Sequence, residues 1–176
     1  MSREKGTVNE MDKETLDKIL AEHKKWLADS NTYKRADLRR ANLWGADLQY
    51  VYLRSAYLLW ANLKWANLKW ANLRGADFRY ADLRGANLRD ADLRGAKLRD
   101  ADLRGADLWY ADLRYAGLQF ANFRHSKLYK TYVSIKSTYI YFSFKPVTSY
   151  HPYTEEQQVE LSNQLLEHVY MCKTGE

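Results

Sequence analysis

Basic side chains at regular spacing are the feature of this sequence that most plainly suggests a chemistry. Two series have members spaced twenty residues apart. The first is Arg54, Arg74, Arg94 and Arg114, and the second is Lys64, Arg84, Arg104 and Arg124. Guanidinium groups bind phosphates and carboxylates through paired hydrogen bonds, so the series suggest an anion-binding face. The same arginines, beside Asp92 and Asp112, can instead form solvated ion pairs that contribute little each. Both interpretations stay open at the level of sequence.

Aromatic side chains follow a second spacing, in which Trp60, Trp65 and Trp70 lie five residues apart. Large exposed aromatic rings usually mark a contact surface. Either the terminal segments of the chain cover these rings, or a partner does. Basic residues interleaved with aromatic ones are also typical of proteins that bind single-stranded nucleic acid. We consider nucleic acid the less favoured partner.

Patterns that carry catalysis or metal binding are missing from the sequence. The LRGA segments lack the GxxxxGK[ST] and GxGxxG spacings that cradle phosphate. His168 and Cys172 lie four residues apart, as two metal ligands on a helix can, but two ligands do not make a metal site. We therefore expect no catalytic, cofactor-binding or metal-binding residues, and a protein that is not an enzyme.

The elements that hold these side chains must be short, because residues 36–135 divide into twenty consecutive units of five. Ala occupies the first position and Leu the third in 17 units each, Asp or Asn the second in 14, and Arg or Lys the fourth in 13. A helix with 3.6 residues per turn would spread the leucines around its axis. An extended segment followed by a corner instead points Ala and Leu inward. Gly occupies the fifth position in five units, where a corner favours positive φ.

This A-(D/N)-L-x-x unit, unbroken over 100 of the 176 residues, resembles the consensus of the pentapeptide-repeat family. The resemblance implies an all-β solenoid, specifically a right-handed quadrilateral β-helix whose square coils each contain four units. Twenty units then imply about five coils, with residues twenty apart stacked on one face. Val51, Tyr52 and Gly117 depart from the consensus only mildly.

The residues on either side of the repeats predict caps, because the terminal coils of a solenoid must be covered. In the segment 1–35, residues from about 10 to 28 are predicted to form an amphipathic helix that starts at Asn9 or Asp12, with His23 on its stripe or surface rather than as a ligand. The segment 136–176 contains the aromatic stretch Tyr139–Phe144 and a second predicted helix from about Thr154 to Met171. This tail either caps its own last coil or meets a second copy in a homodimer.

Composition and charge narrow the function. The single cysteine, Cys172, fits a reducing cytoplasm, and no apolar run approaches the ~20 residues that span a bilayer, so no membrane partner is expected. We interpret the chain as a cytoplasmic, bacterial-type scaffold that binds an unidentified protein, or alternatively as a nucleic-acid or polyanion-binding module. The resemblance also suggests gyrase protection by imitation of DNA, which the 17 basic and 10 acidic residues of the repeats disfavour.

Overall fold

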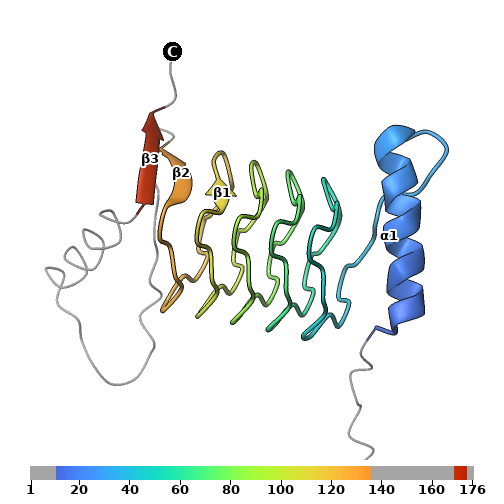
Figure 1. Cartoon of the computed structure of the whole chain (residues 1–176), viewed down its shortest axis with the longest axis horizontal. Helices are drawn as coiled ribbons and strands as arrows, with labels where there is room; N and C mark the ends of the chain where they lie inside the picture. Colours follow the sequence, from blue (N-terminus) through green and yellow to red (C-terminus); the bar gives the residue numbers. More distant parts are fainter. Residues whose placement is uncertain (1–10, 136–168, 174–176) are drawn as a thin grey trace, which may run out of the picture.

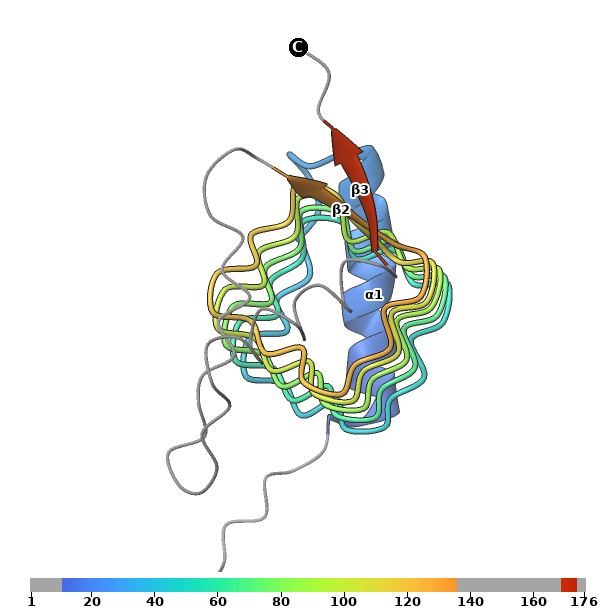
Figure 2. The same ribbon diagram turned by 90° about the vertical axis from the view of Figure 1, so that its left-hand side faces the viewer.

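Stacked backbone is the dominant feature of the computed structural model, which describes residues 11–135 and 169–173. Parallel β-bridges join residues that lie twenty apart, from Asp37↔Tyr57 to Asp107↔Lys127. We call each twenty-residue passage a coil, and each set of residues twenty apart a column. Figure 1 shows the coils side by side along the long axis of the molecule, and Figure 2 shows them superposed when viewed along that axis.

The core consists of the first and third residues of the units. From Ala56 to Leu113 every residue at these two positions is at most 1% exposed. Phe78, which replaces Leu in the middle of the shaft, is also fully buried. The small alanine side chains leave room for the leucines to pack at the density of a protein interior. The inward direction expected for Ala and Leu is therefore observed.

Corners follow each unit, and their backbone is left-handed. The fifth residue has φ between +51° and +68° at nineteen positions, five of them glycines and fourteen of them other residues. The sequence indicated this conformation only for the glycines. Each corner is closed by a bond such as that from the Ala86 N–H to the Leu83 carbonyl, 3.0 Å, and is tied to the next coil by bonds such as that from the Gly85 N–H to the Arg104 carbonyl, 2.9 Å. These hydrogen bonds offset the cost of the left-handed backbone.

Helix α1, Lys13–Ala28, lies across the end of the stack next to the first coil (Figure 1). The Asp12 side chain caps it by accepting the Thr15 N–H at 2.9 Å, so Asp12 is the residue at which the expected helix begins. Leu16 and His23 are its buried residues. The Ala36 N–H donates to His23 Nδ1 at 3.1 Å and joins the helix to the first repeat.

Regular strands are few and short because a corner interrupts the chain at every fifth residue. Strand β1 is Asp112–Leu113, β2 is Thr131–Ile135 and β3 is Val169–Lys173, and they form one parallel sheet in the order β1-β2-β3. In the rest of the described repeats the coils are joined by isolated bridges. The described repeats are thus stacked coils joined by parallel bridges, with little regular sheet.

The end of the chain corrects one expectation. The helix predicted from about Thr154 to Met171 is wrong over its last residues, because Val169–Lys173 is strand β3, paired with all five residues of β2. An unpaired strand edge is costly, and satisfying that edge outweighs a weak local preference for helix. Cys172 therefore does not share a helix with His168. His168, the other residues of the predicted helix before β3 and the stretch Tyr139–Phe144 lie outside the described residues.

Truncating a leucine in the middle of the shaft tests the packing. Leu88 is fully buried, so Leu88→Ala is expected to lower the free energy of unfolding by about 2–5 kcal/mol in urea titrations. Gln119→Ala, at an exposed fourth position, is the control and should change it by less than about 0.5 kcal/mol. A Leu88→Ala protein as stable as the wild type would contradict the inward placement of the leucines.

The joint between α1 and the first coil should be sensitive to pH. Burial lowers the pKa of His23 below 6.5, the Arg35 guanidinium acts in the same direction, and the Arg54 carbonyl opposes them. Below pH 6.5 the unfolded chain therefore binds a proton that the folded chain resists, and stability falls as the pH decreases. We expect a lower free energy of unfolding at about pH 5.5 than at about pH 7.5, by at most about 1.4 kcal/mol per pH unit.

His23→Gln supplies the control for this experiment. Glutamine retains an acceptor for the Ala36 N–H that His23 now binds, but it does not titrate. The variant should lose most of the dependence on pH between these two values. If the free energy of unfolding depended equally on pH in both proteins, the titration would belong to a group other than His23.

Candidate interaction surface

The second residue of a unit determines how the fourth residue leaves the shaft. Where it is Asp or Asn, its side-chain oxygen accepts the backbone N–H of the fourth residue. Asp92 Oδ1 accepts from Arg94 at 3.1 Å, and Asn72 Oδ1 accepts from Arg74 at 3.3 Å. This local bond explains why short side chains with an acceptor oxygen dominate the second position. It fixes the backbone from which the outward basic side chains project.

The first predicted series of arginines forms one column on the shaft, which is Arg54, Arg74, Arg94 and Arg114. Its two halves differ in charge compensation. Arg94 and Arg114 each bond through Nη2 to the aspartate two residues earlier, at 2.6 Å in both cases. Arg54 and Arg74 instead follow Tyr52 and Asn72, and neither forms an ion pair with a described residue. The column therefore contains two guanidinium groups held in ion pairs and two that form none with a described residue.

The paired arginine also stabilises the charged form of Asp92. The Arg94 guanidinium keeps the pKa of Asp92 below its ordinary value, although burial acts in the opposite direction. Exposed pairs of this kind typically contribute ~0–1 kcal/mol. The interpretation of solvated ion pairs thus fits Arg94 and Arg114, while Arg54 and Arg74 leave positive charge at the surface.

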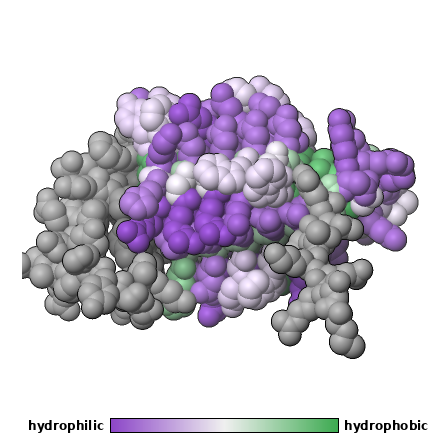
Figure 3. Space-filling model, turned by 90° about the horizontal axis from the view of Figure 1, so that it is seen from below, coloured by the Kyte–Doolittle hydropathy of each residue, from purple (hydrophilic) through white to green (hydrophobic). Residues whose placement is uncertain are grey.

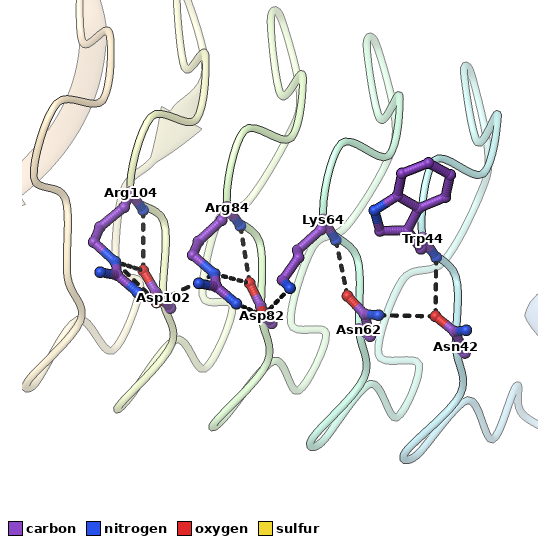
Figure 4. Close-up of polar contacts among 8 residues, drawn as sticks. All are labelled: Asn42, Trp44, Asn62, Lys64, Asp82, Arg84, Asp102 and Arg104. Carbon is purple, nitrogen blue, oxygen red and sulfur yellow. Dashed lines mark hydrogen bonds and ion pairs between the residues drawn. The ribbon is translucent and has the colours of Figure 1, made fainter. Parts of the chain in front are cut away.

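The second series, Lys64, Arg84, Arg104 and Arg124, lies in another column, which begins with Trp44. Figure 4 shows Trp44 and the first three of these basic residues with the second residues of their units. Arg84 bonds to Asp82 at 2.6 Å and approaches Asp102 at 3.6 Å. Lys64 reaches only the Asp82 carboxylate that Arg84 already holds, at 3.7 Å. In the two coils nearest α1, the second residue of the unit in this column is Asn instead of Asp. There the Asn62 side chain donates to Asn42 Oδ1 at 2.8 Å.

The three tryptophans spaced five residues apart occupy the corners of consecutive units, as the sequence predicted. Trp60, Trp65 and Trp70 are 53%, 65% and 41% exposed. Trp60 stacks on Tyr80 of the next coil with ring centroids 4.4 Å apart, and Trp70 stacks on Tyr50 of the preceding coil at 4.8 Å. Helix α1 does not bury these rings. Whether residues 136–168 contact them lies outside the described residues.

Sequence reasoning missed these stacks, although their signal is present in the sequence. Tyr50 and Trp70, like Trp60 and Tyr80, are fifth residues twenty positions apart. Reading the corners by column instead of along the chain would have paired them. Figure 3 shows one side of the molecule, where strongly hydrophilic rows and a paler row run along the stack.

Two further observations concern the described residues only. They contain no group of three His, Cys, Asp or Glu side chains placed to hold a metal ion. No helix among them combines the length and the apolar character needed to cross a bilayer.

Comparisons with known proteins agree with the repeat. A family model described as "Pentapeptide repeats (8 copies)" matches residues 34–69, 71–109 and 91–129. No curated protein matches the chain. Among solved structures, the chain is similar to Rfr23 from the cyanobacterium Cyanothece 51142, with 34% identity over 58% of this chain and 65% of that one and a TM-score of 0.37.

Two other solved structures are similar over part of the chain. HetL from Nostoc sp. strain PCC 7120, involved in heterocyst differentiation regulation, shares 31% identity over 56% of this chain and 49% of its own, with a TM-score of 0.32. A pentapeptide repeat protein from the Arabidopsis thaliana thylakoid lumen shares 26% identity over 72% and 74%, with a TM-score of 0.32. The matched region spans about half of HetL and under two thirds of Rfr23.

A double-mutant cycle tests how firmly the paired arginines are held. Asp92→Asn keeps the oxygen that accepts the Arg94 N–H but removes the charge, and Arg94→Gln removes the guanidinium. We expect a coupling of about 0.2–1 kcal/mol in urea unfolding, smaller in high salt. A coupling above about 2 kcal/mol, insensitive to salt, would make Arg94 a structural residue that is unavailable to a partner.

Proposed function

Because this chain belongs to the pentapeptide-repeat family, we propose that it is a rigid, non-enzymatic scaffold that binds a protein partner through its outward side chains. We assign it a right-handed quadrilateral β-helix of about five coils. Bridges between residues twenty apart and the buried first and third positions support that architecture. The single cysteine supports a cytoplasmic location.

The observation that carries this proposal is the set of large aromatic rings exposed on a regular backbone. Thirteen tyrosine, tryptophan and phenylalanine side chains of the described residues are more than a third exposed, including Trp60 and Trp70. Aromatic and arginine side chains supply most of the binding energy at protein interfaces. Stacks such as Trp60 on Tyr80 hold the rings in place before binding, which reduces the entropy lost on association.

A second candidate function is supported by a separate observation. Arg54 and Arg74 form no ion pair with a described residue, so this end of their column offers charge to a nucleic acid or another polyanion. A homodimer through the C-terminal segment is a further proposal about partners. Gyrase protection by imitation of DNA is the third and least favoured, because the net charge of the repeats is positive.

Affinity capture from the native lysate distinguishes these functions. A tagged chain mixed with untagged chain is expected to retain a protein after nuclease treatment and from about 50 mM to about 500 mM salt. The double variant Trp60→Gly/Trp70→Gly should lose that protein, since the outward rings are gone, while Gly suits the left-handed corners. Gln119→Ala is the matched surface control.

The other outcomes identify the alternatives. Recovery that disappears with nuclease, salt or the variant Arg74→Glu/Arg94→Glu would contradict a protein scaffold and favour polyanion binding. Recovery of untagged chain alone would identify a second copy as the partner.

A further inference from the structure

Two tryptophans differ from the other four in having no partner ring or cation. Trp26, Trp60, Trp70 and Trp109 each lie against an aromatic ring, and three of them also against a Lys or Arg. Trp44 and Trp65 have no such contact with a described residue, and they are 52% and 65% exposed. Both indole rings are therefore exposed without a ring or cation contact among the described residues.

These two tryptophans are neighbours of Lys64, one in its column and one along the chain, and the Lys64 ammonium itself lies 3.7 Å from Asp82 in the next coil. Trp44 precedes Lys64 in its column, and Figure 4 shows its indole directed toward the coil that carries Lys64. Trp65 follows Lys64 in the chain and occupies the corner. The Gly45 N–H donates to the Lys64 carbonyl at 2.8 Å, so the two coils are in direct contact at this point. Both tryptophans thus lie beside the same basic residue.

The indole of Trp65 has one covered face and one open face. A Cβ built on Gly85, in the next coil, would lie only 2.4 Å from Trp65 Cε3, so the ring packs against the Gly85 backbone. On the opposite side, a Cβ built on Gly45 would meet nothing within 4 Å. The space beside the Gly45 corner is therefore open, and this is the side on which we expect a second ring to stack on Trp65.

The charge around this corner is positive. Residues 48–76 contain no Asp or Glu, and their basic residues are Arg54, Lys64, Lys69 and Arg74. The nearest carboxylate to Lys64, Asp82, is already held by Arg84 at 2.6 Å. Lys69 lies 3.6 Å from the Trp70 ring centroid and forms no ion pair with a described residue. An anion near Trp65 would meet no like charge from residues 48–76, and the Asp82 carboxylate of the next coil is paired with Arg84 and lies near Lys64.

We propose that Trp44, Lys64, Trp65 and Lys69 form a binding site for single-stranded nucleic acid, which we call the Trp65 site. A base stacks on the open face of Trp65, Trp44 contacts a neighbouring base, and the two lysines bind the flanking phosphates. Base stacking on aromatic rings together with cationic backbone contacts is how sequence-tolerant single-strand binders work. Duplex DNA cannot stack a base on Trp65, because its base faces are already stacked on one another. An acidic peptide has no base to stack on the open face of the ring. This site does not depend on the scaffold proposal.

Fluorescence anisotropy of a labelled oligothymidylate tests the proposal with the full chain. We expect binding at about 50 mM salt that weakens roughly sevenfold at about 200 mM, as two phosphate contacts predict. Trp65→Gly should weaken binding at least about fivefold. It converts the unit to ANLKG, with Gly at φ +58°, so the corner remains favourable and the variant should fold.

Two further variants give the assay its controls. Lys64→Gln/Lys69→Gln should weaken binding and make it nearly independent of salt. Trp60→Gly removes another exposed corner ring, one that is already stacked on Tyr80, and it should leave oligonucleotide binding unchanged. Trp60→Gly is part of the double variant expected to abolish protein capture, but it leaves the Trp65 site intact. The scaffold proposal and the Trp65 site can therefore fail independently of each other.

Several results would overturn the Trp65 site. These are no binding of the oligothymidylate at low salt, equal binding by Trp65→Gly and wild type, and a loss in Trp60→Gly as large as that in Trp65→Gly. Equal or tighter binding of duplex DNA, heparin or polyglutamate would show attraction by charge alone and would also exclude stacking as the basis of recognition.

Discussion

The left-handed backbone at every fifth residue is the constraint on which the rest of the structure depends. It turns the chain after each unit, so that Ala and Leu always face inward and residues twenty apart always meet. Such a φ is unfavourable for the fourteen residues there that are not glycine. Hydrogen bonds between coils and the burial of one leucine per unit compensate for it, and neither would form without the corner.

The sequence predicted the repeat, the inward residues and the family correctly because all three depend on a five-residue period that any reader can count. It did not predict left-handed corners at residues such as Trp65 or Tyr80, since bulky side chains seldom adopt that region. There the stacking of the coils, and not the residue itself, decides the conformation.

The candidate surface was only partly predictable, for a related reason. The spacing placed Arg54 and Arg94 in one column but said little about which of them would be neutralised. That depends on whether the second residue is Asp, as before Arg94, or Tyr, as before Arg54. The end of the chain was harder still. Val169–Lys173 has an apolar spacing compatible with a helix, and only the exposed edge of β2 selects a strand.

The pairing of β3 with β2 has a consequence for how the protein is made. A ribosome releases α1 and the coils in the order in which they stack, so each new coil can settle on a finished neighbour. The edge of Thr131–Ile135 must wait until Val169–Lys173 has been synthesised. During that interval the unpaired edge of β2 is free to pair with strands of other polypeptides. Slow translation or premature termination between these segments would therefore favour aggregation of a shaft that is otherwise already folded.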